Sequence, residues 1–234
     1  MNDVSYVERR DRIEHYFDRT APHVWARLTS DAPVSGIRAT VRAGRDRMRA
    51  TLLGWLPTDL HGARILDAGC GTGALSVEAA RRGAEVVAID LSPTLVKLAE
   101  ERLPADLGFG RVTFHAGDML DPELGEFDHV VGMDSLIHYE PADVVRALSA
   151  LAPRVRHSML FTFAPRPPAL AAMHAVGKLF PRGDRAPAIV PVAEATLRDA
   201  LRGAPGLAGW HAARTSRVAS GFYTSQAMEL ECGE

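Results

Sequence analysis

The sequence predicts an α/β fold in which helices cover a mostly parallel sheet and a helical arm comes first. Along residues 61–164, apolar and β-branched runs alternate with helical patterns. Strands joined by helices imply parallel pairing with right-handed crossovers. A glycine-rich turn at residues 67–73 joins the first strand of this region to its first helix. The 234 residues are 47% hydrophobic and 24% charged, which fits one ordinary domain with a substantial core.

We expect four successive regions within one globular unit. Residues 1–60 form a helical arm, and residues 61–164 form the α/β core. Prolines bound the insertion at residues 165–192, which favours a helical lid over a substrate; plain packing over the sheet edge is the alternative. Residues 193–234 add a helix and a closing strand pair.

The arm carries two helical patterns. Ile13, Tyr16 and Phe17 share one face of the first. The second has an apolar stripe that consists of Ile37, Val41, Gly44, Met48 and Leu52. Its remaining surface is basic through Arg38, Arg42, Arg45, Arg47 and Arg49. Most of these arginines are expected on a solvated face. One or two can instead grip a substrate carboxylate with the guanidinium fork, and Arg38, Arg42 and Tyr16 are the candidate substrate contacts.

The core elements follow from the apolar runs and the residues that flank them. Strands are expected at 64–68, 85–90, 111–116, 127–133 and 157–163. Helices are expected at 73–82, from Ser92 onward and at 141–151. Ser92 suits the N-cap of its helix and Pro93 the first turn. A last strand or hairpin is expected within residues 217–231.

Composition argues against several classes of partner. A net charge of −2 provides no basic field, so nucleic acid is not favoured. Cys70 and Cys232 are too few for a disulfide framework or a four-ligand zinc site, and no protein-bound metal is expected. The polar N-terminus and the lack of an 18-residue apolar run favour a cytoplasmic protein.

The turn at residues 67–73 predicts a nucleoside ligand that carries an amine. Gly69, Gly71 and Gly73 follow G-x-G-x-G spacing, unlike the G-x-G-x-x-G of dinucleotide sites. Asp67 precedes the first glycine by two residues, whereas a pyrophosphate prefers a helix N-terminus free of fixed negative charge. These features favour S-adenosylmethionine (SAM), which has an ammonium and a sulfonium and no phosphate.

Acids after the next two strands complete the expected cofactor site. Asp90 ends the second strand, followed by Leu91, and an acid there commonly accepts from ribose hydroxyls; it can also simply cap the following helix. Asp118 follows the third strand and can accept from an adenine amino group, with Met119 against the ring. Gly-Asp is also ordinary turn chemistry.

These turns at the carboxyl ends of parallel strands resemble the class I SAM-dependent methyltransferases, whose fold is Rossmann-like. In that family, positions matching Asp67 and the three glycines hold the methionine part of SAM. Positions matching Asp90 and Asp118 hold ribose and adenine. The family sheet has seven strands with the last antiparallel, so the resemblance implies the same sheet here.

The loop after the fourth strand, Met-Asp-Ser-Leu-Ile-His-Tyr, is expected beside the transferable methyl. Asp134 is a candidate cofactor contact and Tyr139 a candidate substrate contact. His138 is the candidate catalytic residue, as a general base, an orienter of a carboxylate or a contact to a metal in the substrate; a hydrogen-bonded structural histidine is the alternative. The loop lacks the Asn/Asp-Pro-Pro-aromatic run of many methyltransferases that act on exocyclic amines.

A more specific resemblance covers nearly the whole chain. The segments EHYFDRTA, DAGCGTG, MDSLIHY, FTFAP, GKLFPRGDRAP and GFYTSQAMEL look like those of the magnesium-protoporphyrin IX O-methyltransferases of (bacterio)chlorophyll biosynthesis. That family methylates one propionate of the magnesium porphyrin and leaves S-adenosylhomocysteine (SAH). Some relatives have a functional tyrosine in the arm, where this chain has Thr29, so that role is not carried over.

The resemblance also implies chemistry and partners. A propionate has a pKa of about 4.3 and is already an anion at neutral pH, so no strong base is needed. Rate should come mainly from alignment and enclosure, which favours His138 as an orienter first and a proton acceptor second. The implied partners are magnesium protoporphyrin IX and the large subunit of magnesium chelatase, with loose peripheral membrane contact.

Three other functions compete with this one. A methyltransferase acting on a quinone precursor or another small molecule would share the cofactor turn but has no reason to carry the GKLFPR segment. A non-catalytic SAM-binding module would not need an intact cofactor set together with a lid. A nicotinamide dehydrogenase is disfavoured by Asp67 and by the glycine spacing.

Overall fold

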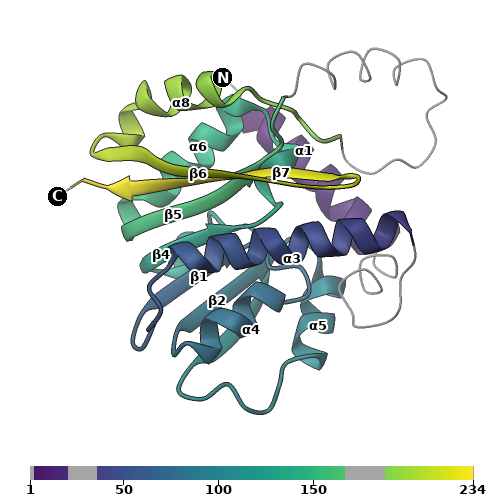
Figure 1. Ribbon diagram of the computed structural model, residues 1–234. Helices are drawn as coiled ribbons and strands as arrows, with labels where there is room; N and C mark the ends of the chain where they lie inside the picture. The colour runs from purple at the N-terminus through teal and green to yellow at the C-terminus, as the bar shows by residue number, and fades with distance from the viewer. Residues whose placement is uncertain (1–2, 21–35, 167–187, 234) are drawn as a thin grey trace.

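A seven-stranded sheet forms the centre of the protein, as the computed structural model shows for residues 3–20, 36–166 and 188–233 (Figure 1). Its strands are β1 (Arg64–Ala68), β2 (Glu85–Asp90), β3 (Arg111–Ala116), β4 (Phe127–Gly132), β5 (Val155–Phe163), β6 (Trp210–Ser220) and β7 (Tyr223–Cys232). They pair in the order β3-β2-β1-β4-β5-β7-β6. β1 to β5 are parallel, whereas β7 is antiparallel to both of its neighbours. The expected α/β fold and its antiparallel last strand are therefore confirmed.

Helices pack against both faces of this sheet. They are α1 (Asp3–His15), the π-helical turn η1 (Tyr16–Thr20), α3 (Ile37–Trp55), α4 (Ala74–Arg81), α5 (Pro93–Glu101), α6 (Pro141–Leu151) and α8 (Glu194–Arg202). Short 3₁₀ turns are η2 (Pro122–Leu124), η3 (Leu136–His138), η4 (Ala152–Arg154) and η5 (Pro205–Leu207).

Successive strand residues point into two separate hydrophobic cores. Leu66 and Val87 belong to the core that includes α6 and α8, whereas Ile65 and Val86 belong to the core that includes α3 and α4. This alternation with apolar residues on both faces is what helices on both sides of a parallel sheet require. The arrangement leaves the carboxyl ends of the strands as the edge where loops gather.

Local sequence signals set most of the boundaries. Ser92 caps α5 by accepting from the Leu95 amide at 3.2 Å, as predicted, and Pro93 opens the helix. β4 ends one residue earlier than predicted and β5 begins two residues earlier, at Val155. The final strand pair is longer than expected, because β6 already begins at Trp210.

Ile37 begins the expected apolar stripe of α3 but lies outside its buried part. Ile37 is 56% exposed, whereas Met48 and Leu52 are fully buried. The reason is that Ile37 is the first residue of α3, at the helix end that extends past the strands (Figure 1). The rest of α3 packs against β6 and β7, so this part of the expected arm is a face-covering helix of the core.

Two of the sequence predictions fall on residues that the structure does not describe. Most of the expected lid, residues 167–187, lies outside the described residues. At the two ends of the lid, Pro165 and Val192 form a β-bridge. Thr29 also lies outside them. Among the residues that are described, no helix has the length and hydrophobicity to cross a membrane.

A glycine in α3 allows the closest approach between this helix and β7. A Cβ on Gly44 would overlap the ring of Tyr223, with Tyr223 Cβ itself only 2.9 Å away. Gly44 and Tyr223 are both buried. The missing side chain therefore lets the tyrosine ring lie directly on the helix backbone.

Replacing Gly44 by alanine should destabilise the protein by about 2 kcal/mol or more, because the new methyl must displace a buried ring. The matched control is Gly54→Ala on the same helix, where a Cβ meets nothing within 4 Å. That change should stabilise by up to about 1 kcal/mol through helix propensity. Urea unfolding of both variants checks this, and equal effects would contradict the packing role of Gly44.

Candidate active site

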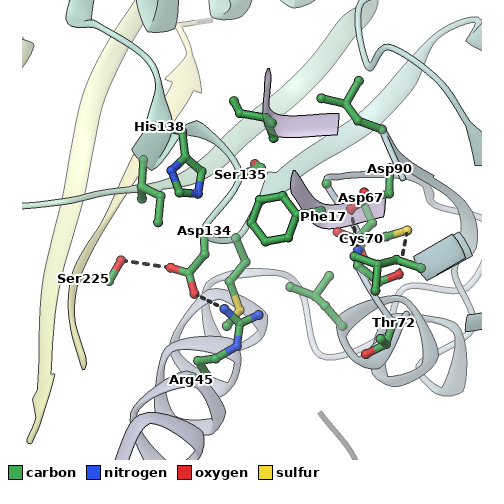
Figure 2. Close-up of a pocket in the computed structure, with 18 of the residues that line it drawn as sticks. Phe17, Arg45, Asp67, Cys70, Thr72, Asp90, Asp134, Ser135, His138 and Ser225 are labelled. Carbon is green, nitrogen blue, oxygen red and sulfur yellow. Dashed lines mark hydrogen bonds and ion pairs between the residues drawn. The ribbon is translucent and has the colours of Figure 1, made fainter. Parts of the chain in front are cut away.

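A cavity of about 610 Å³ opens where the carboxyl ends of the parallel strands meet. The loops after β1, β2, β3 and β4 form one part of its wall. α1 and η1, residues 41–49 of α3, and the turn between β6 and β7 with the start of β7 line other parts of it. Open α/β sheets bind ligands at this edge. Figure 2 shows Asp67, Cys70 and Thr72 toward one side of the cavity, and Asp134, His138 and Ser225 toward the other.

The glycine turn is held by the backbone of the neighbouring strand. The amides of Gly69 and Cys70 both donate to the Ile89 carbonyl, at 2.8 and 2.9 Å. Gly69 and Gly71 have φ of 90° and 55° and line the cavity, so glycine is needed there for conformation and for close approach. Gly73 does not line the cavity among its described residues.

Gly73 instead serves the packing of α4. It is the N-cap of that helix, with φ of 78°. A Cβ there would lie 3.0 Å from the Phe114 ring and 3.3 Å from Ala99. The third glycine of the turn therefore lets the helix approach β3 and α5, while the first two shape the cavity.

Asp67 is a buried carboxylate beneath the turn, and Asp90 beside it is partly buried. Asp67 is 1% exposed, and Ser76 Oγ donates to its Oδ2 at 2.5 Å. Burial raises the pKa of Asp67 to about 7, although the Ser76 hydrogen bond opposes the shift. Asp90 accepts from the amides of Gly71 and Ser92, at 2.8 and 3.0 Å. Burial also raises the pKa of Asp90, against the effect of these two bonds.

Asp90 and Leu91, the two residues expected near the ribose, line the cavity at the end of β2. The amide bond from Ser92 also supports the alternative that Asp90 stabilises the start of α5. The bond from Gly71 goes further, because it fixes the carboxylate against the glycine turn. One residue thus joins the ends of β1 and β2.

The first helix closes over Asp118, which the sequence did not reveal. Tyr6 Oη and Arg10 Nη1 each donate to the Asp118 carboxylate at 3.2 Å. Tyr6 also stacks on Tyr139, with ring centroids 5.2 Å apart. Met119, Tyr139 and Asp118 all line the cavity. The pKa of Tyr6 is raised, mainly by burial, so its hydroxyl remains a donor at neutral pH.

His138 lies in the cavity wall opposite the turn. It is 8% exposed, and Arg9 Nη1 donates to its carbonyl oxygen at 2.9 Å. The ring of Phe17 lies 5.9 Å from the imidazole, centroid to centroid, and Figure 2 shows Phe17 between His138 and the turn. Tyr16 also lines the cavity. The N-terminal segment therefore positions the loop that carries the candidate catalytic residue.

Asp134 is the most constrained residue of the site. Its φ is 57°, which is uncommon for a residue with a side chain, and its side chain is only 6% exposed. Arg45 Nη1 donates to its Oδ2 at 2.6 Å, and Tyr223 Oη lies 3.1 Å from both of its oxygens. Ser225 Oγ and Thr162 Oγ1 also donate to Oδ1, at 3.2 and 3.3 Å.

The arginines of α3 divide by helical spacing. Arg42, Arg45 and Arg49 recur every three to four residues and line the cavity, whereas Arg38 is exposed and does not line it among the described residues. Arg45, Tyr223 and Phe17 were not predicted as site residues. The helical spacing of the three arginines was the signal in the sequence that could have pointed to Arg45.

The chemistry of the cavity suits a polar nucleoside at one end and an anion at the other. Acids lie near the end of β1, at the end of β2 and just after β3, and the Arg45 guanidinium from α3 meets the loop after β4. No cluster of three or more histidine, cysteine, aspartate or glutamate side chains that could hold a metal occurs within the described ranges.

Comparisons with known proteins place this chain within a family. A model described as a methyltransferase domain matches residues 65–158, and one described as the C-terminus of magnesium-protoporphyrin IX methyltransferase matches residues 132–232. The fold and the cavity thus define a class I SAM-dependent methyltransferase. A magnesium-protoporphyrin O-methyltransferase of Rhodobacter capsulatus is 52% identical, covering 96% of this chain and 97% of the relative. The chain belongs to the family of magnesium-protoporphyrin IX methyltransferases.

Two further comparisons bear on the cofactor and on an alternative. The crystal structure of magnesium protoporphyrin IX methyltransferase from Synechocystis PCC 6803 with bound SAH has a TM-score of 0.82 and 29% identity, over 95% of this chain and 99% of that one. A ubiquinone biosynthesis O-methyltransferase of Xanthomonas oryzae is 39% identical, but only over 53% of this chain and 55% of the relative.

The raised pKa of Asp67 predicts a pH-dependent stability. The folded protein keeps a proton on Asp67 up to about pH 7, whereas the unfolded chain releases it near pH 4. The unfolding free energy of the cofactor-free protein should therefore fall between these pH values relative to Asp67→Asn, by up to a few kcal/mol. Urea titrations at pH 5 and pH 8 measure this difference, and a constant difference between the two proteins would contradict it.

Proposed function

We propose that this protein transfers the methyl group of SAM to one propionate carboxylate of magnesium protoporphyrin IX and forms the monomethyl ester, in (bacterio)chlorophyll biosynthesis. The observation that carries the proposal is the two-ended cavity, in a chain that aligns almost end to end with a curated enzyme of that name. Acids and a glycine turn line one end, and arginines and a buried histidine line the other.

The cofactor end fits SAM. Gly69 and Gly71 allow the backbone to approach a ligand, and the buried acids favour a ligand that brings positive charge. We propose that Asp67, Gly69 and Gly71 surround the methionine part, that Asp90 with Leu91 meets the ribose, and that Asp118 with Met119 meets the adenine. SAM supplies an electrophilic methyl on its sulfonium, and the neutral SAH remains after transfer.

The substrate end fits a carboxylate that is already ionised. A propionate anion is neutralised when it takes a methyl group, so the protein has to align it and exclude water. His138 is proposed to orient the carboxylate, since its loop is fixed by Arg9 and its ring is enclosed by Phe17. Tyr16 and Tyr139 are proposed to contact the porphyrin beside it.

A quinone precursor is the second candidate substrate. The likeness to a ubiquinone biosynthesis enzyme supports it, but that likeness covers only about half of this chain. The match to the C-terminal model of the magnesium-protoporphyrin enzymes includes β5, β6 and β7, which carry the turn at the cavity mouth. A purely SAM-binding role would leave the arginine-lined end without a purpose.

The mouth of the cavity suits delivery of an apolar macrocycle. Phe222 is 76% exposed and Ile189 is 48% exposed, and both line the opening. We include in the proposal that the protein is cytoplasmic and receives its substrate from the large subunit of magnesium chelatase, with peripheral contact to a membrane. The exposed aromatic and aliphatic side chains support this handover, because they would be covered during it.

The test is incubation of the purified protein with SAM and magnesium protoporphyrin IX, followed by mass measurement. We expect a gain of one methyl group and one equivalent of SAH. A demethylated quinone precursor under the same conditions should remain unchanged, because its phenol lacks the carboxylate that the arginines would hold. Methylation of the quinone precursor alone would overturn the proposal.

A His138→Ala variant separates binding from turnover. It should bind SAH with unchanged affinity and lose most of its turnover, because the carboxylate is no longer oriented. Unchanged turnover would remove His138 from the proposed mechanism.

A further inference from the structure

We infer that Arg45 is the residue that receives the reacting propionate, and that Asp134 is its positioning residue rather than a cofactor contact. This inference rests on the proposed function and adds the part of the site that distinguishes an acid from its ester. It departs from the sequence-based prediction, which favoured Arg38 and Arg42 for the carboxylate and gave Asp134 to the cofactor.

The hydrogen bonds of Asp134 are already used within the protein wall. A carboxylate has about four lone-pair directions, and Arg45, Tyr223, Ser225 and Thr162 supply four donors. The backbone amide of Asp134 in turn donates to Thr162 Oγ1 at 2.7 Å. A carboxylate so surrounded has little capacity for a ligand amine, and its strained backbone is typical of a residue held for a functional purpose.

The same contacts fix the guanidinium of Arg45 in the cavity wall. Its side chain is 21% exposed and lines the cavity, and Asp134 Oδ2 engages its Nη1. A guanidinium holds its donors in one plane, so a contact at one nitrogen restricts the orientation of the whole group. Figure 2 shows Arg45 reaching from α3 toward Asp134, with His138 on the far side of that carboxylate. The plane of the cation is therefore set before any ligand arrives.

The other two arginines of the cavity are less suited to this role. Arg49 pairs with two carboxylates, through Nε with Glu78 Oε1 at 2.5 Å and through Nη2 with Asp46 Oδ1 at 2.9 Å. Both of these acids are more exposed than Arg49 itself. Arg42 lies about one turn nearer the start of α3 than Arg45. Arg45 is paired with the loop that carries His138.

Sharing the cation with Asp134 suits methyl transfer. An arginine that held the propionate at full strength would stabilise the reactant anion and lower its nucleophilicity. Asp134 takes part of the positive charge, so Arg45 can orient the carboxylate without neutralising it. After transfer the ester is uncharged, and the attraction that aligned the acid is gone.

Binding of an acid and of its ester tests this inference directly. The SAH-loaded protein is titrated with magnesium protoporphyrin IX and with its dimethyl ester, which has the same macrocycle and no carboxylate. The wild type should bind the diacid more tightly. Arg45→Gln should weaken diacid binding about ten- to hundredfold while leaving diester and SAH binding unchanged.

The matched control is Arg202→Gln, and Arg42→Gln tests the competing arginine of the cavity. Arg202 lies on α8 with a side chain that is 75% exposed, so its replacement should leave every affinity unchanged. Arg45→Lys keeps the charge but not the planar fork and should restore part of the diacid affinity. Asp134→Asn tolerates the same backbone conformation and should lower kcat more than it raises KM, because the cation is then unshared.

Each other outcome overturns the inference. If Arg42→Gln removes the discrimination and Arg45→Gln does not, the carboxylate belongs to Arg42. If Arg45→Gln weakens SAH instead, the guanidinium serves the carboxylate of the cofactor. If the wild type methylates the diacid but Arg45→Gln keeps its discrimination, the inference fails and the proposed function stands. Absence of turnover in the wild type would instead refute the proposed function.

Discussion

The buried carboxylate of Asp134 holds together the substrate end of the cavity. It follows β4 and receives donors from α3, β5 and β7, which are elements far apart in the sequence. Two features permit this convergence. The absence of a side chain at Gly44 lets Tyr223 lie on α3, and the antiparallel β7 carries the Tyr223 hydroxyl back to the carboxyl edge of the sheet. Without either feature, the walls of the cavity would not meet.

The cofactor end depends on a different constraint, the parallel order of β1, β2 and β3. Parallel strands bring their carboxyl ends to one edge, so the three acids at or near those ends lie together. Burial then raises the pKa of Asp67 and Asp90, and hydrogen bonds from Ser76, Gly71 and Ser92 offset part of that cost. Such a site favours a ligand that brings positive charge.

The features that depend on local sequence could be predicted, whereas the contacts that depend on tertiary packing could not. β1, β2 and β3 and the cap at Ser92 follow from apolar runs and turn residues, so their positions agreed with the prediction. The role of Gly73 in packing on Phe114 was hidden, because a glycine pattern does not say what each Cβ would meet. The pairing of Arg45 with Asp134 spans 89 residues, and no spacing rule reveals such a contact.

In the proposed reaction the methyl group ends on a carboxylate oxygen. The most direct measurement uses SAM with a trideuterated methyl group and follows the label in the porphyrin product before and after alkaline hydrolysis. The account predicts one label for each product molecule and its complete loss on hydrolysis, with the starting diacid recovered, because only an ester is cleaved in this way. A label that survives hydrolysis would place the methyl on carbon or nitrogen and would contradict it.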